Sequence, residues 1–131
     1  MMHARISVSF AVALLVAGAA LAQERLANST PDMRAKIQTE FMTKKLGLKA
    51  DQIPKVQEIN LKYAQKMEPV LKGNEGPLVK LRAAKAIDQD KDAELERVLS
   101  KEQYQQYLAS KEEMREKVEQ RIEEKRQGAG N

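Results

Sequence analysis

The chain has 131 residues, of which 42% are hydrophobic and 32% are charged, with a formal net charge of +4 and no cysteine. A chain of this length is typical of one domain, and the lack of cysteine excludes a disulfide-stabilised fold. Acidic residues are interleaved with the basic ones along the sequence. Because no stripe of one charge emerges, the basic balance does not predict nucleic-acid binding.

Residues 1–22 have the pattern of a secretory signal peptide. His3 and Arg5 precede an uncharged, mostly apolar run that closes with Ala-Leu-Ala at residues 20–22. Small residues at this spacing predict cleavage before Gln23. An uncleaved membrane anchor is the alternative, but the run is short for a span, which needs about 20 apolar residues. We therefore expect an exported protein with no stable membrane insertion after cleavage.

Removal of residues 1–22 changes the balance of the chain. About 35% of the remaining residues are apolar and about 38% are charged. That composition suits a thin helical structure better than a thick globular core. We expect residues 23–28 to be a flexible N-terminus, residues 29–126 to form a single all-helical domain and residues 127–131 to be a disordered tail.

A first helix is predicted to begin at Ser29 or Thr30, which are both good N-cap residues. Pro31 follows, and proline suits the first helical position because its missing N–H has no partner there. Gly47 is available for the left-handed residue of a C-cap, so the helix is expected to end at Leu46.

A second helix is predicted to begin within residues 50–54. Asp51 is its candidate N-cap, because Lys49 stands where serine or threonine would be favourable. Apolar side chains then fall on one face of the helix: Val56, Ile59, Tyr63, Met67 and Val70. Pro69 is expected to bend or end the helix. Residues 73–77 contain two glycines and a proline, which predicts a turn.

A third helix is predicted from Pro77 or Leu78 to Val98. Its apolar stripe is interrupted by the polar run at residues 88–92, which leaves either an exposed helical turn or a break. We expect a continuous helix with a weak middle. The alternating aspartates of this run resemble the opening of an EF-hand loop, but Ala93 stands where that loop needs glycine. The run is therefore interpreted as a solvated acidic face.

A fourth helix is predicted from Lys101 to about Arg126. Its apolar stripe is formed by Tyr104, Leu108, Met114, Val118 and Ile122. Tyr107 lies beside this stripe rather than on it. Since tyrosine is well suited to recognition, Tyr107 is the candidate for a surface contact.

The start of the fourth helix carries a motif that occurs twice. Ser100 is a good N-cap, and Gln103 can reach back to its backbone N–H, which completes a capping box. Leu99 precedes the cap, where an apolar residue can pack on the new helix. Leu48 and Gln52 repeat the Leu-x-x-x-Gln spacing before the second helix. Both copies are expected to be structural motifs rather than ligand sites.

No constellation of residues after position 22 points to catalysis or to a cofactor. The only histidine of the sequence is His3, and there is no cysteine, so the usual ligands of transition metals are missing. The serines have no histidine to activate them as nucleophiles. The four later methionines are scattered along the chain, and we expect them to fill the core. The sequence predicts no enzyme, no catalytic residue, no metal and no cofactor.

The signal peptide, the small charged helical chain and the two motifs together resemble the Spy/CpxP-like periplasmic proteins of Gram-negative bacteria, which carry Leu-Thr-x-x-Gln motifs. The likeness covers residues 48–117. Ser100 replaces the threonine of one motif and keeps its capping hydroxyl, whereas Lys49 departs from the pattern in the other. The resemblance implies four helices in a thin, elongated helical-hairpin arrangement, paired as a curved antiparallel homodimer in the periplasm.

Two functions from different classes remain open. The resemblance implies an ATP-independent chaperone or envelope-stress modulating protein, whose partners are unfolded or partly folded envelope proteins. Helices with apolar stripes and mixed charge suit such weak, adaptable contacts. The alternative is a structural helical module that pairs with one specific envelope partner protein. Suppression of aggregation of unrelated proteins favours the first function, and a single stoichiometric partner favours the second.

Overall fold

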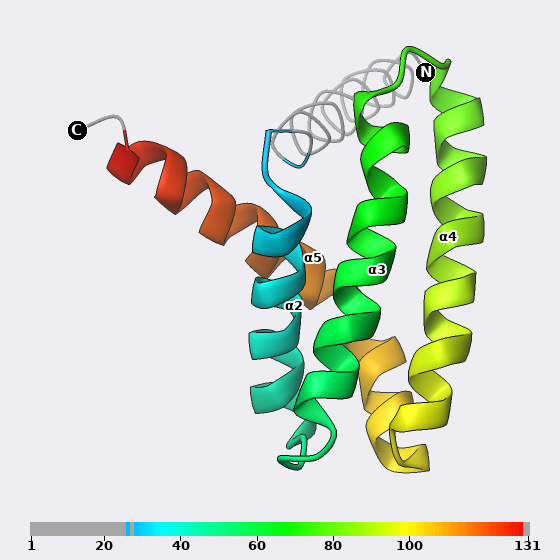
Figure 1. The fold of residues 1–131 in the computed structure, drawn as a ribbon, viewed down its shortest axis with the longest axis vertical. Helices are drawn as coiled ribbons and strands as arrows, with labels where there is room; N and C mark the ends of the chain where they lie inside the picture. The colour runs from blue at the N-terminus through cyan, green and yellow to red at the C-terminus, as the bar shows by residue number, and fades with distance from the viewer. Residues whose placement is uncertain (1–25, 27, 130–131) are drawn as a thin grey trace, which may run out of the picture.

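The computed structural model describes residue 26 and residues 28–129, and within them it consists of four helices (Figure 1). These are α2 (Pro31–Leu46), α3 (Ile53–Lys72), α4 (Pro77–Val98) and α5 (Lys101–Ala129). No strand occurs in the described residues, so the all-α class is confirmed. The expected signal peptide lies outside them, as does most of the expected flexible N-terminus. None of the described helices is long and apolar enough to cross a membrane.

The two ends of α2 follow the predicted capping pattern. The hydroxyl of Thr30 accepts a hydrogen bond from the N–H of Met33 at 3.1 Å, and Pro31 stands in the first turn. Gly47 takes φ 63° and ψ 51° at the C-cap, a left-handed conformation that favours glycine. Thr30 is therefore the N-cap, and Ser29 instead donates its hydroxyl to the carbonyl of Leu26 at 2.6 Å.

The start of α3 differs from the sequence prediction. Asp51 does not cap the helix; Gln52 occupies the N-cap position and makes no side-chain capping bond to α3. The reason lies in the preceding turn, where the carbonyl of Lys49 accepts from the N–H groups of Gln52 and Ile53 at 3.0 and 3.2 Å. Asp51 lies within this turn and is exposed. A backbone carbonyl thus binds N–H groups at the start of α3, where the sequence predicts capping by the carboxylate of Asp51.

Pro69 lies inside α3, and the helix continues to Lys72. A proline near the end of a helix removes only one hydrogen bond, so the last turn survives. Gly73 follows, and a Cβ atom at this position would lie 2.7 Å from the carbonyl oxygen of Pro69. The close approach explains why the chain has glycine there.

Each of the two C-terminal helices runs without a break. α4 is continuous through residues 88–92, as expected. α5 continues to Ala129, so residues 127–129 are helical and not part of a tail. Residues 130–131 lie outside the described part of the chain.

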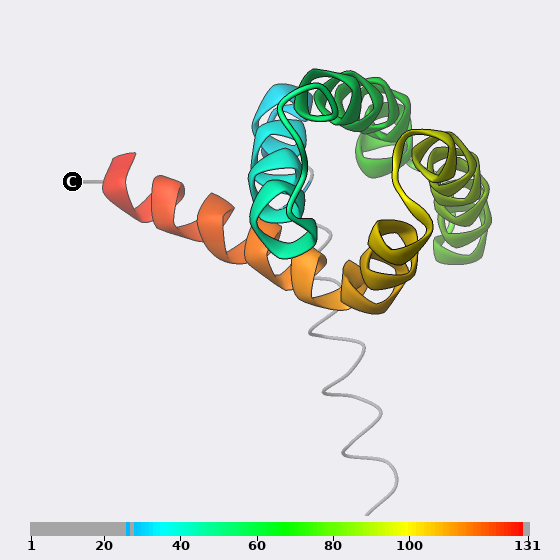
Figure 2. The same ribbon diagram turned by 90° about the horizontal axis from the view of Figure 1, so that it is seen from below.

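The four helices form a ring. The chain runs down α2, up α3 and down α4, so both motif turns lie at the same end of the molecule (Figure 1). Seen from below, α2, α3 and α4 form an arc, and α5 crosses its open side (Figure 2). α2 packs on α3 and α5, and α3 packs on α4, whereas α4 approaches the backbone of α5 at few positions. Diagonal pairs of these described helices make no close backbone contact.

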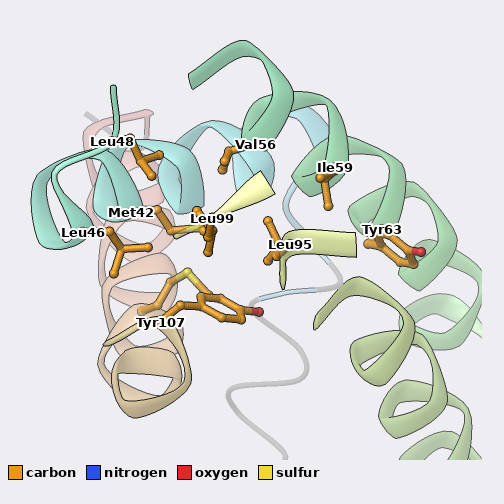
Figure 3. Close-up of a cluster of buried hydrophobic side chains, with 10 residues drawn as sticks. Met42, Leu46, Leu48, Val56, Ile59, Tyr63, Leu95, Leu99 and Tyr107 are labelled. Atoms are coloured by element: carbon orange, nitrogen blue, oxygen red, sulfur yellow. The ribbon is translucent and has the colours of Figure 1, made fainter. Parts of the chain in front are cut away.

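The main core lies where the two motif turns meet. Figure 3 shows side chains of all four helices and of both turns gathered there. Its buried members are Met42, Leu46, Leu48, Val56, Ile59, Tyr63, Leu95, Leu99, Tyr107 and Met114. A smaller cluster of Ile37, Val118 and Ile122 joins α2 to α5 further along. Met42 and Met114 thus fill the core as predicted.

Tyr107 was the candidate for a surface contact, and that prediction is wrong. Its side chain is only 2% exposed, and its hydroxyl donates a hydrogen bond to Asp92 Oδ1 at 2.7 Å. Leu108, which the sequence placed on the apolar stripe, is 38% exposed. The buried face of α5 runs through Tyr107, Met114 and Val118, whose separations of seven and four residues fit a helical period better.

Candidate functional site

The two copies of the repeated motif contact each other through their glutamines. Nε2 of Gln52 donates to Oε1 of Gln103 at 2.8 Å, and Nε2 of Gln103 donates to Oε1 of Gln52 at 3.1 Å. Each Oε1 also accepts the backbone N–H three residues earlier, from Lys49 and from Ser100, both at 2.9 Å. The sequence showed the repeat but not the pairing, because both glutamines were interpreted as caps of their own helices.

The side-chain amide of each glutamine also donates to a backbone carbonyl near the opposite turn. Nε2 of Gln52 donates to the carbonyl of Val98 at 3.1 Å, and Nε2 of Gln103 lies 3.4 Å from the carbonyl of Leu46. Leu48 and Leu99 lie buried beneath the pair, in the main core. The motif residues therefore lock the two turns together.

Ser100 forms the capping box that the sequence predicts, since its hydroxyl accepts from the N–H of Gln103 at 3.1 Å. We expect Ser100→Ala to lower the free energy of unfolding by about 1 kcal/mol, because it leaves one N–H of α5 without its acceptor. Denaturant unfolding of the two proteins measures this difference. Unchanged stability would contradict a capping role for the hydroxyl.

The candidate site is a pocket inside the ring, with a volume of about 540 Å³. All four helices line it. Its apolar lining consists of Leu26, Tyr63, Ala64, Met67, Leu71, Leu81, Ala84, Ile87, Met114 and Val118. Its polar lining consists of Arg34, Gln38, Lys85, Asp88, Lys91, Lys111, Glu112 and Arg115. Pockets of this size and mixture are typical of binding sites for small or extended apolar ligands.

Lys91 is the most unusual residue of this lining. Its side chain is buried, and Nζ donates to Oε1 of Gln38 on α2 at 2.9 Å. Burial lowers the pKa of Lys91 to about 8, although the charges of Asp88 and Asp92 act in the opposite direction. Sequence reasoning missed this residue, because it lies in the polar run that was interpreted as a solvated face.

The acidic run is turned partly inward, so its interpretation as a solvated face is wrong for Lys91, which is 7% exposed, and for Asp92, whose side chain is 17% exposed. Nζ of Lys111 on α5 binds Asp88 at 2.5 Å and Asp92 at 2.8 Å. Burial acts to lower the pKa of Lys111, but the hydrogen bonds to the two aspartates outweigh it and raise the pKa. Asp90 lies on the exposed side of α4. Long side chains thus span the side of the ring where the backbones of α4 and α5 stay apart.

Arg34 closes the pocket on the side of α2 and α3. It is 4% exposed, and its guanidinium donates to the carbonyls of Leu26 and Ser29, both at 2.9 Å. It also donates to the carbonyl of Ala64 at 3.3 Å and to the carboxylate of Glu68 at 2.5 Å. These bonds fix the segment before α2 against the middle of α3.

The mouth of the pocket is marked by its exposed lining residues. Lys85 and Leu81 belong to α4, and Arg115 belongs to α5, where it pairs with Glu112. Leu81 is 64% exposed, and Leu78 and Val79 on the same helix are 59% and 51% exposed. Exposed apolar side chains therefore extend from the pocket to the N-terminal end of α4, which is its open end.

The burial of Lys91 gives a pH prediction. The folded protein releases this proton near pH 8, whereas the unfolded chain keeps it up to about 10.5. Stability should therefore rise with pH above 8, by on the order of 2 kcal/mol up to pH 10. The measurement is denaturant unfolding across this range. The Lys91→Met variant should lack the rise, and an equal rise in both proteins would contradict the assignment to Lys91.

The lining of the pocket combines apolar and charged side chains. In the described part of the chain, no group of three His, Cys, Asp or Glu side chains is placed to hold a metal ion. Two ion pairs lie within the lining, Lys111 with Asp88 and Arg115 with Glu112, and most of the remaining lining is apolar. The pocket can therefore hold an apolar ligand and offer it polar contacts from α2, α4 and α5.

Comparison with known proteins gives one family. No curated protein and no solved structure matches the chain. A family model described as a domain of unknown function (DUF4890) matches residues 19–107, which include α2, α3, α4 and the first turns of α5. The matched region contains both motif copies and most of the pocket lining, and the chain belongs to the DUF4890 family.

Proposed function

We propose that the protein is an exported, ATP-independent chaperone of the periplasm that binds apolar segments of unfolded or partly folded envelope proteins. The observation that supports it is the apolar surface that runs from the pocket onto the open end of α4, where Leu78, Val79 and Leu81 are more than half exposed. A contiguous exposed apolar surface marks an interaction site. The resemblance to Spy/CpxP-like proteins gives the same expectation of export and chaperone activity.

The charges around this surface fit weak binding. Lys85 and Arg115 lie at the mouth of the pocket, where Arg115 pairs with Glu112. The neighbouring exposed residues of α5 carry charges of both signs. Such groups keep a client contact shallow and keep the chaperone soluble. A client can then be released without a nucleotide cycle.

We also propose a curved antiparallel homodimer of thin helical hairpins, because a small chain with a limited core commonly covers its remaining apolar surface by symmetric pairing. The packed and oppositely running pairs α2–α3 and α3–α4 supply the helical hairpins of such an assembly. Sedimentation at micromolar concentration tests it, and a monomer would contradict it. The Leu81→Ser variant should be included, since a dimer that buries Leu81 would dissociate.

An aggregation assay tests the chaperone proposal. Light scattering of two or three unrelated unfolding proteins is expected to fall when the protein is added without ATP. Leu81→Ser should weaken this protection, whereas Leu108→Ser, which changes an exposed leucine on α5 outside the pocket, should not. Raising the salt should alter capture, because surface charges are screened beyond about 10 Å at 0.1 M. If no client is protected, a single dedicated envelope partner becomes the better hypothesis.

A further inference from the structure

The wall of the pocket carries an excess of positive charge. Five of its lining side chains are basic and two are acidic. Arg34, Lys111 and Arg115 are each held by carboxylates. Among the described residues, Lys85 and Lys91 have no carboxylate within ion-pair distance. The pocket therefore has two cationic groups, one buried and one at the mouth, that are not neutralised by direct pairing.

The buried group has unused donors. A lysine ammonium can donate three hydrogen bonds. Lys91 is 7% exposed and donates one, to Gln38. Of the neighbouring carboxylates on α4, Asp88 and Asp92 are both bound by Lys111, and Asp90 lies on the exposed side of the helix. Because buried donors without acceptors are costly, an acceptor group brought in by a ligand would be stabilised at this position.

The rest of the wall restricts what can carry that acceptor. Side chains from α3, α4 and α5 give the pocket an apolar lining, and its volume of about 540 Å³ lies within the usual range of small-molecule sites. A small polar anion would leave this apolar surface unfilled. A ligand that matches both parts has an apolar body and one anionic head group.

We propose that the pocket binds a small amphipathic anion, an alkyl chain with one carboxylate or phosphate group, whose head group is held by the ammonium of Lys91. Lys85 at the mouth adds long-range attraction for the same charge. This activity goes beyond the capture of unfolded chains and depends only on the pocket. Fatty acids and lysophospholipids share the chemistry, and separate probes distinguish the two head groups.

Calorimetric titration of the purified protein tests the proposal. The probes are decanoate, decyl phosphate and decyltrimethylammonium, which have the same chain length, each kept below its micellar concentration. At least one of the two anions is expected to saturate one site per chain and to bind about tenfold or more tightly than the cation, since a charge-assisted hydrogen bond is lost with the cation. Equal affinity for anions and cation would overturn the proposal.

Variants locate the site. Lys91→Met should weaken binding of the anion about tenfold or more and leave the cation unaffected. Lys36→Met, on the exposed side of α2, is the matched control and should change neither. Ala84→Phe should fill the pocket and abolish binding of all three probes. Circular dichroism checks that each variant is folded.

Two results would overturn the assignment. Unchanged decanoate affinity in a folded Lys91→Met variant would show that Lys91 does not hold the head group. Unchanged decanoate affinity in Ala84→Phe would show that the ligand does not occupy this pocket. If Lys91→Met does not fold, Ala84→Phe alone decides whether the ligand occupies this pocket. The titration uses no unfolded client, so its outcome is independent of the aggregation assay.

Discussion

Gln103→Ala is expected to lower the free energy of unfolding by about 2–3 kcal/mol. The substitution removes the acceptor for the N–H of Ser100 and both bonds of the amide pair with Gln52. These bonds join the α2–α3 turn to the α4–α5 turn, so their loss also loosens the core below. Gln105→Ala, at an exposed position on the same helix, is the control and should cost only a few tenths of a kcal/mol.

A double-mutant cycle isolates the amide pair itself. Gln52→Ala should destabilise the protein by a similar amount, about 2 kcal/mol. The double variant is expected to be less destabilised than the sum of the two single variants, by about 1 kcal/mol or more, because both single changes break the same pair. Denaturant melts of the four proteins give this coupling. Additive effects would show that the two glutamines act separately.

Arg34→Met is expected to lower the free energy of unfolding by about 3 kcal/mol. Methionine keeps most of the apolar volume, so the loss reports the hydrogen bonds of the guanidinium. The carbonyls of Ser29 and Ala64 then lose the guanidinium as a donor, and the carboxylate of Glu68 keeps only Lys72. Arg82→Met, at an exposed position on α4, is the matched control. A loss no larger than that of the control would show that water replaces these bonds.

The part of the Arg34 contribution that comes from the Glu68 carboxylate should be lost in acid. Burial acts to raise the pKa of Glu68, but hydrogen bonds from Lys72 and Arg34 outweigh it and hold the pKa below its ordinary value of 4.5. Because the folded pKa is lower, this stability is present above pH 4.5 and is lost as the pH falls through the folded pKa. The difference between wild type and Arg34→Met should therefore shrink below pH 4.5.

The helices and their caps could be predicted from the sequence because those signals are local. Thr30, Gly47 and Ser100 act through atoms within three or four residues of themselves, so proximity in the chain is enough. The apolar period was sufficient to place α5 but not its rotation. Tyr107 and Leu108 are adjacent, and choosing between them requires the side chains that α5 meets on α2 and α4.

The pocket could not be predicted, since it depends on residues that the sequence keeps apart. The polar run of α4 has the composition of a solvated face, and Lys91 is buried only in the assembled ring, where its ammonium donates to Gln38 of α2. Lys111 likewise binds two aspartates from another helix. The glutamine pair joins positions 51 residues apart. Repetition of the motif was the one signal that the two turns are equivalent, and it did not indicate that they touch.

The ring has one side that backbone packing does not close. Between α4 and α5, the links beyond their connecting turn include Tyr107 and Lys111, whose long side chains reach Asp88 and Asp92. Local opening follows the least packed boundary of a structure. Amide protons of the first half of α4 should therefore exchange with deuterium sooner than those of α2 and the first half of α3, so the ring behaves as a clasp that opens at α4 while the paired turns remain its hinge.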